Sequence, residues 1–147
     1  MIKHFFKSAY IQGQWQRDVL LTINSDGRIA HIEKDSAVGT ANNHTGLLIA
    51  GMANVHSHAF QRAMAGLGEI AGVSDDSFWS WRRVMYDFLA KISPEDFEAI
   101  ADQLYMEMLK AGFTSVGEFH YLHHQSNGQP YSDRLEMSRR LISSASK

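Results

Sequence analysis

Residues 51–66 read GMANVHSHAFQRAMAG, and they place two histidines, His56 and His58, one residue apart at the end of a short apolar run. In an extended strand, residues i and i+2 point to the same face, so the two imidazoles would project side by side. Neutral imidazole is the commonest side-chain ligand for zinc and related metals. The pair therefore suggests a metal site. The alternative, which the motif by itself favours, is a polar strand face that carries two histidines by chance.

The composition is that of a globular protein with enough residues for a real hydrophobic core. The chain has 147 residues, of which 44% are hydrophobic and 20% are charged, as in an ordinary folded domain. Its net charge of −2 provides no electrostatic footprint for nucleic acid or an anionic membrane. No run approaches the ~18 consecutive apolar residues that would span a bilayer. We therefore expect neither nucleic acid nor a membrane as a partner.

The chain has no cysteine, which excludes a disulfide framework and thiolate chemistry. Any metal site must then consist of histidine and carboxylate ligands, and five of the eight histidines fall in two clusters. The N-terminal stretch MIKHFFKSAYIQGQW has neither a sustained apolar core nor a small-residue cleavage pattern, so it does not resemble a secretory signal. These features favour a cytoplasmic protein.

The first fifty residues are predicted to be rich in β-strands. Apolar and polar residues alternate over 19–24, a turn signal follows at 25–27, and a return strand is expected over 28–33,. Ile29 and Ile32 differ in parity, so that strand should be bulged or buried on both faces. Residues 37–46 are small and polar and predict a loop. Residues 47–49 then open an apolar strand that leads to the histidine pair.

Helical patterns dominate after Gly66. A loop over 66–76 and a cap at Ser77 should precede a helix whose buried face carries Phe78, Trp81, Met85, Phe88 and Ile92,. Ser93 and Pro94 begin a second helix. Its apolar stripe is predicted at Phe97, Ile100, Leu104 and Met108, and its end at Lys110 and Gly112,.

The last part of the chain is predicted as a strand followed by a helix. The strand should cover residues 113–121, and Ser132-Asp133 should cap a helix that carries Leu135, Ile142 and Ala145. From residue 47 onward the predicted order is therefore strand, helix, helix, strand, helix. Strands that alternate with helices indicate parallel βαβ units, so we expect the α/β class.

Longer stretches carry a family resemblance. GMANVHSH resembles the first-strand signature of the amidohydrolase superfamily of metal-dependent hydrolases, although Ala50 and Ala53 stand where that signature has proline. The blocks NVHSHAFQRAMAGL, DSFWSWRRVMY, QLYMEMLKAGFTSVGEFHYLHH and GQPYSD together resemble the formimidoylglutamate deiminases within it. The resemblance covers nearly the whole chain and is weakest over residues 1–46.

The resemblance implies a small β-sandwich domain that flanks a (β/α)₈ barrel. Residues 1–48 would be the N-terminal part of the sandwich, and residues 49–147 would be the first strands and helices of the barrel. A barrel needs ~200 residues or more, so the chain should be a truncated fragment that stops after roughly two of the eight βα units.

The resemblance also implies the reaction. It is the zinc-dependent hydrolysis of N-formimino-L-glutamate to N-formyl-L-glutamate and ammonia, a step of histidine degradation. His56 and His58 would be two ligands of one divalent metal ion, which activates water. The remaining ligands and the proton-transferring residues would lie on later barrel strands, so we expect no catalytic residue within this chain and no activity from it alone.

Two alternative functions remain at this point. One is another amidohydrolase deaminase, which acts on a purine, a pyrimidine or a guanidine. The other is a truncated remnant without catalysis, which is compatible with the first hypothesis because the missing ligands would leave the chain inert. In the first hypothesis the partner is a small-molecule substrate that carries carboxylates. The full-length enzyme could also form a homo-oligomer.

Three residues are implied to bind substrate: Gln61, Arg82 and Tyr121. A glutamine amide can donate to a carboxylate, and arginine is its bidentate partner. Tyr121 would lie at the C-terminal end of a barrel strand, where barrel sites concentrate. The simpler alternatives are an exposed polar residue for Gln61, a solvated helix face for Arg82 and rim packing for Tyr121.

Other conspicuous residues receive lesser roles. His120 has either a supporting role beside the metal ligands or a place in the core with a hydrogen bond. His123 and His124 should face solvent, and the aromatic residues at 78, 79 and 81 should pack in the core. Glu118 could neutralise a partner inside the barrel, without a firm assignment.

Overall fold

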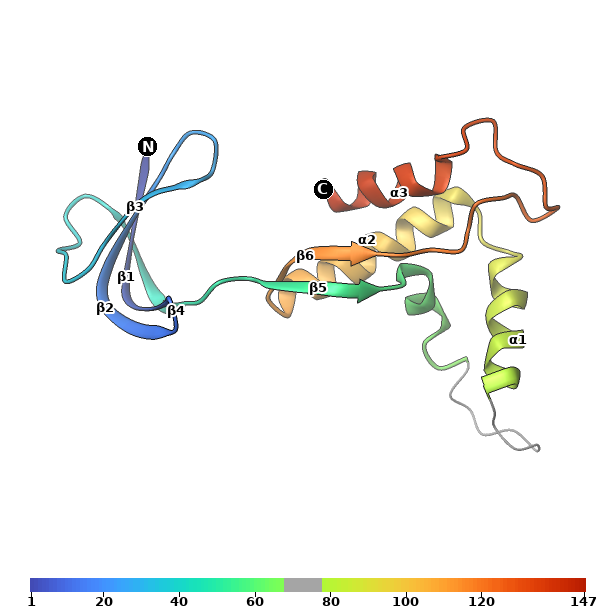
Figure 1. Cartoon of the computed structure of the whole chain (residues 1–147), viewed down its shortest axis with the longest axis horizontal. Coiled ribbons are helices and arrows are strands. Elements are labelled where there is room, and N and C mark those ends of the chain that lie inside the picture. Colours follow the sequence, from blue (N-terminus) through green and yellow to red (C-terminus); the bar gives the residue numbers. More distant parts are fainter. Residues whose placement is uncertain (68–77) are drawn as a thin grey trace. The chain divides into compact units, whose positions relative to one another are not determined.

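The computed structural model describes residues 1–67 and 78–147. The chain divides into two compact units, Met1–Gly51 and Met52–Lys147, drawn in Figure 1. The expected mixed α/β class is confirmed, because the first unit is a β-sheet and the second combines a parallel strand pair with helices. In the described part of the chain, no helix is long and apolar enough to cross a membrane.

The first unit is a four-stranded sheet with the order β3-β2-β1-β4. Its strands are β1 (Ile2–Ile11), β2 (Gln14–Ile23), β3 (Ile29–Glu33) and β4 (Asn42–Leu48). The β1–β2 hairpin turns at Gln12 and Gly13, with φ values of 51° and 80°. Positive φ at both turn residues matches the right-handed twist of the flanking strands. β3 pairs antiparallel with β2, whereas β4 pairs parallel with β1.

The core of this unit centres on Ala9, Val19 and Leu21, which are all buried. The predicted return strand is confirmed as β3, and its expected irregularity appears as a register shift. Thr22 pairs with His31 while Ile23 pairs with Ile29, so one residue of β3 is extra. A bulge of this kind reconciles two isoleucines of different parity.

Two predictions in this region are wrong. The expected loop over 37–46 contains the start of β4, whose backbone pairs with β1 although most of its side chains are exposed. The apolar residues 47–49 also do not continue into the histidine strand, because β4 ends at Leu48 and the next strand begins at Met52. The polarity of a side chain indicates whether it is buried, but not whether its backbone pairs with another strand. An exposed edge strand therefore has a sequence like that of a loop.

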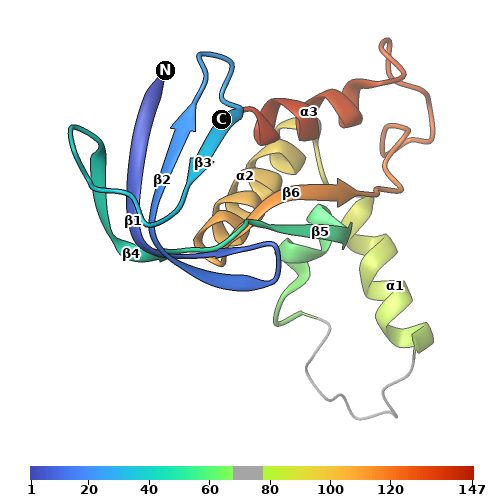
Figure 2. The same cartoon turned by 60° about the vertical axis from the view of Figure 1, so that its left-hand side comes forward.

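The second unit contains a parallel strand pair with helices around it. Its elements are β5 (Met52–Ser57), the 3₁₀ helix η1 (Ala59–Met64), α1 (Phe78–Leu89), α2 (Pro94–Lys110), β6 (Phe113–Glu118) and α3 (Glu136–Ala145). β5 and β6 are adjacent and parallel, and Figures 1 and 2 show both arrows running the same way beside α2. The predicted order of strands and helices is therefore confirmed.

Helix α2 follows its sequence signals closely. The Ser93 hydroxyl accepts from the Asp96 backbone N–H at 3.0 Å, and the Asp96 carboxylate accepts from the Ser93 N–H at 3.1 Å. This reciprocal capping box, with Pro94 at the first helical position, fixes the start of the helix,. Gly112, with φ of 93°, follows its end as predicted.

The buried stripe of α2 contains Phe97 as predicted, but its next two members lie one residue beyond the predicted Ile100 and Leu104. Phe97, Ala101 and Tyr105 are the buried residues of the helix, and Ile100, Leu104 and Met108 pack against the edge of that core only in part. The core also takes Phe60 of η1, Met85 of α1 and Leu141 of α3. The core of the second unit is therefore formed by α2 together with η1, α1 and α3.

Several boundaries and faces differ from the predictions. Phe78 and Trp79 are 61% and 69% exposed, and of the three aromatic residues expected in the core only Trp81 packs there. β6 stops at Glu118, so Tyr121 lies past the strand and not at its end. Ser77 and most of the loop predicted before it lie outside the described residues.

Helix α3 begins later than predicted. Asp133 accepts from the Leu135 N–H at 2.9 Å, but the helix starts at Glu136 and has no side-chain cap. Its buried residues are Met137, Leu141 and Ser144, whereas Ile142 is 66% exposed. Both sets recur at helical spacing, so periodicity in the sequence did not distinguish them.

Candidate functional site

The end of β5 brings the two predicted metal ligands together. His56 lies in the strand and His58 directly follows it, and their Nε2 atoms are 3.1 Å apart. The two rings meet edge to face, with centroids 4.9 Å apart and planes at 83°. His56 is exposed and His58 is half-buried. The pair therefore presents two facing nitrogens at an accessible position.

A backbone carbonyl sets the orientation of His58. Its Nδ1 atom lies 2.9 Å from the carbonyl oxygen of Phe119. That oxygen can only accept, so Nδ1 carries the proton and donates it. In the neutral ring the free lone pair is then on Nε2, which faces His56. Metal-binding histidines commonly have such a partner on the second nitrogen.

The geometry of the pair fits part of a metal site. Zinc–nitrogen bonds of ~2.0–2.1 Å at a tetrahedral angle place two ligand nitrogens ~3.3 Å apart, close to the 3.1 Å seen here. Catalytic zinc takes about three protein ligands. Within residues 1–67 and 78–147, no group of three or more His, Cys, Asp or Glu side chains could hold a metal ion. A metal ion bound to this pair would therefore need further ligands.

Glu118 holds the segment that follows His58. Its Oε1 atom accepts from the Ala59 N–H at 2.7 Å, and its Oε2 atom accepts from the Tyr105 hydroxyl at 3.3 Å. Burial is the main cause that raises the pKa of the Tyr105 phenol, and the negative charge of Glu118 is the second. The hydroxyl therefore keeps its proton and donates it to Glu118. Sequence reasoning gave Glu118 no firm role. Its partners are two neutral donors and not a buried cation.

Aromatic rings surround His58. The ring of Tyr121 lies nearly parallel to it at a centroid distance of 5.9 Å, and Phe119 meets it edge-on at 5.9 Å. Phe60 lies 6.3 Å away. Tyr121 is half exposed, so the structure brings this predicted substrate residue beside the histidine pair. Phe119, which supplies both a ring and the carbonyl, was missed from sequence, because a backbone acceptor leaves no side-chain signal.

The other two predicted substrate residues lie on helices. Gln61 is in η1, where its backbone N–H donates to the His58 carbonyl at 2.9 Å, and it is half-buried. Arg82 is in α1, with its guanidinium 5.8 Å from the Trp79 ring centre and 5.3 Å from that of Tyr86. None of the contacts described for Arg82 joins it to the histidine pair. Gln61 is therefore adjacent to the pair by chain position, whereas the described contacts do not connect Arg82 to it.

The far end of η1 is tied to α2. Two guanidinium nitrogens of Arg62 donate to the Glu107 carboxylate at 2.7 and 2.8 Å. The hydrogen bonds from Arg62 and Gln103 lower the pKa of Glu107 to about 2. This bidentate pair anchors the last turn of η1 to α2.

The second histidine cluster has no described contact with the first. His120 is buried, its Nε2 atom lies 3.0 Å from the Ser138 hydroxyl oxygen, and its ring lies against those of Phe97 and His123. Burial, with the nearby His123, lowers the pKa of His120. These contacts favour a hydrogen-bonded core residue over a supporting role beside the ligands. His123 and His124 are exposed, as predicted.

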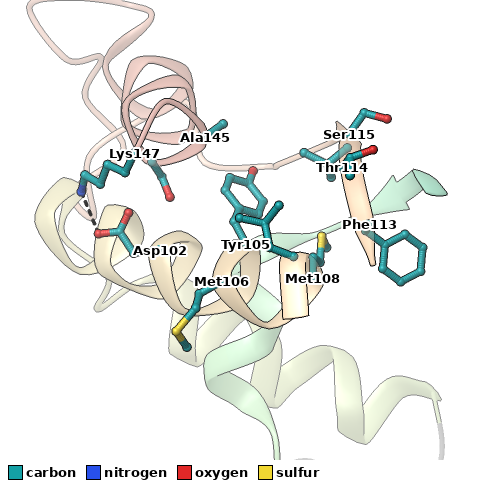
Figure 3. A pocket seen from close by; sticks show the side chains of 12 residues that line it. Asp102, Tyr105, Met106, Met108, Phe113, Thr114, Ser115, Ala145 and Lys147 are labelled. Atoms are coloured by element: carbon teal, nitrogen blue, oxygen red, sulfur yellow. Dashed lines mark hydrogen bonds and ion pairs between the residues drawn. The ribbon is translucent and has the colours of Figure 1, made fainter. Parts of the chain in front are cut away.

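A groove of about 630 Å³ runs along α2, β6 and α3. Figure 3 shows apolar side chains along it, among them Tyr105, Met106, Met108 and Phe113. Its charged residues, Asp102 and Lys147, pair with each other at 2.7 Å. None of the predicted site residues lines this groove, and most of its lining is apolar.

Two family models and a curated relative match this chain. Residues 47–143 match the amidohydrolase family, and residues 5–46 match the N-terminal domain of formimidoylglutamate deiminase HutF. A formimidoylglutamate deiminase from Pseudomonas aeruginosa is 50% identical over 142 residues, which are 97% of this chain and 31% of that protein. The chain therefore spans about a third of the length of that relative.

Solved structures also match nearly all of this chain, which again covers about a third of their length. The crystal structure of an amidohydrolase from Brucella melitensis has a TM-score of 0.93 and 45% identity, over 99% of this chain and 32% of the other. A mutant atrazine chlorohydrolase, TrzN from Arthrobacter aurescens, solved with zinc and atraton, has a TM-score of 0.76 and 19% identity, over 99% of this chain and 33% of the other. This second likeness concerns the fold alone. The family match covers the larger part of the sequence, including the histidine strand, and the chain belongs to the amidohydrolase family.

Proposed function

We propose that this chain supplies the first two metal ligands and part of the substrate pocket of a formimidoylglutamate deiminase. The observation that carries the proposal is the convergence of His56 Nε2 and His58 Nε2 at 3.1 Å, within a sequence 50% identical to an enzyme of that name. The reaction would replace the imino nitrogen of N-formimino-L-glutamate by the oxygen of water. The products would be N-formyl-L-glutamate and ammonia.

The metal would be a single divalent ion, with zinc as the expected one. The amidohydrolase superfamily is metal-dependent, and imidazole ligands suit zinc. When bound, the ion supplies Lewis-acid activation of water for attack on the formimino carbon. The role of this chain is to orient the ligands: the Phe119 carbonyl fixes the His58 tautomer, and Glu118 holds the segment after it.

The substrate residues would act through their polar groups. Formiminoglutamate carries two carboxylates, and the guanidinium of Arg82 is suited to bind one of them in a bidentate manner. The Gln61 amide and the Tyr121 hydroxyl would donate further hydrogen bonds. Tyr121, beside His58, is the one of the three that the geometry supports most directly.

Two broader features belong to the same proposal. Residues 1–48 would form part of a small β-sandwich domain and residues 49–147 the first units of a (β/α)₈ barrel. The whole enzyme would act on its small-molecule substrate in the cytoplasm. Because the described residues contain no complete ligand set, this chain without the remaining ligands would be inactive.

The test is the metal content of the full-length enzyme that carries this sequence. We expect His56→Ala and His58→Ala each to remove most of the bound zinc, measured by elemental analysis, and to abolish ammonia release. His31→Ala is the matched control, since His31 is an exposed histidine of β3 in the other unit. Zinc content equal to that of the wild type in either site variant would refute the assignment.

A further inference from the structure

We infer that Glu118 is a positioning residue, which keeps His58 Nε2 directed at His56 by holding the first residue of η1. This inference rests on the proposed function, because it takes the histidine pair as the metal-binding group. It assigns a role to a carboxylate that touches neither histidine ring. The evidence is a set of hydrogen bonds that run from the end of β6 to the end of β5.

The first observation is the N–H group that Glu118 satisfies. Ala59 begins η1 directly after His58, and its side chain is fully buried. The first N–H groups of a helix have no partner within it, and His58 provides no side-chain cap. Glu118 Oε1 accepts from Ala59 N at 2.7 Å instead. A carboxylate from the neighbouring strand thus fixes the peptide that follows His58.

The second observation is that the next residue holds the His58 ring itself. Phe119 N donates to the Ser57 carbonyl at 2.9 Å, and the Phe119 carbonyl accepts from His58 Nδ1 at 2.9 Å. Glu118 and Phe119 therefore contact the backbone before His58, its ring and the backbone after it. Displacement of Glu118 would move the carbonyl that sets the His58 tautomer.

The third observation is that α2 fixes Glu118. The Tyr105 hydroxyl donates to Oε2 at 3.3 Å, which leaves Oε1 for Ala59. Tyr105 is buried in the core of the second unit. No ion pair described for this chain involves Glu118, so its carboxylate accepts from neutral donors on both sides. Tyr105, Glu118 and Ala59 form a connection from the core to the histidine pair.

The experiment compares Glu118→Ala and Glu118→Gln with Glu107→Gln in the full-length enzyme. Glu107→Gln weakens the Arg62 anchor in the last turn of η1, and neither Glu107 nor Arg62 has a described contact with His56 or His58. The readouts are the zinc dissociation constant from chelator competition, the His58 tautomer in metal-free protein from nitrogen NMR, and the melting temperature. Activity is not needed for any of them.

We expect Glu118→Ala to weaken zinc binding by ~10-fold or more, the usual effect of losing a group that orients a ligand, and to mix the His58 tautomers. Glu118→Gln should recover most of the affinity, because its amide oxygen still accepts from Ala59. Glu107→Gln should lower the melting temperature with the zinc affinity unchanged. Wild-type zinc affinity in Glu118→Ala, or an equal loss in Glu107→Gln, would overturn the inference.

Two further measurements keep the test decisive. If Glu118→Ala does not fold, hydrogen exchange of the Ala59 amide in the wild type decides, since the inference requires that amide to be protected and rapid exchange contradicts it. If the wild type binds no zinc through His56 and His58, the proposed function fails. The tautomer measurement in metal-free protein still decides the role of Glu118.

Discussion

At the scale of single residues, the site depends on which nitrogen of His58 carries the proton. The motif His-x-His specifies two imidazoles but not their tautomers. The structure supplies that information through the Phe119 carbonyl at 2.9 Å from Nδ1. A neutral His58 would then bind a metal ion only through Nε2, and this is the atom that faces His56.

Arg82 carries a residue-scale prediction. In the full-length enzyme, Arg82→Met should lower kcat/KM for formiminoglutamate by ~10-fold or more, because a charge-assisted hydrogen bond of ~1.5–3 kcal/mol to a substrate carboxylate would be lost. Arg83→Met is the matched control, since Arg83 is exposed on the same helix. Steady-state kinetics of both variants is the measurement. Equal kinetics in Arg82→Met and wild type would show that Arg82 does not bind a substrate carboxylate.

At the scale of elements, α2 provides a prediction about stability. Ser93→Ala removes the side-chain half of the capping box at the start of α2. The loss should lower the free energy of unfolding by ~1 kcal/mol, measured by urea denaturation of the full-length protein. Ser126→Ala, in the exposed loop before α3, should leave stability unchanged. The capping box would have no stabilising role if both variants unfolded at the same urea concentration.

The elements also show which parts of the fold a sequence can reveal. Helix α2 was predicted with its start and end because Ser93, Pro94 and Gly112 act on the backbone next to them. Strand β4 was missed because its stabilising partner, β1, lies far away in the sequence. The close approach of His56 and His58 was predictable because both are side chains of one motif. Glu118 and the Phe119 carbonyl were not, because their roles depend on the pairing of β5 with β6.

At the scale of the whole molecule, the second unit leaves much of its strand pair uncovered. Among the described strands, β5 and β6 form a sheet of only two members, so each has an outer edge without a strand partner. Parallel strands are normally buried on both faces, and a sheet of two strands is marginally stable in water. Here Val55 is 84% exposed and Leu109, beside the groove, is 66% exposed. Exposed edges and apolar surface of this kind promote association.

The last prediction follows from that exposed surface and from the lack of a complete set of metal ligands among the described residues. Residues 1–147 expressed alone should be weakly structured, should tend to aggregate and should release no ammonia from formiminoglutamate in the presence of zinc. Some helicity should persist, since α2 has strong local signals at both ends. Circular dichroism, light scattering and an ammonia assay measure these outcomes, with His56→Ala and buffer as controls. Turnover above both controls would mean that the chain completes its metal site through another chain, because two histidines alone leave catalytic zinc without the ligands that it requires.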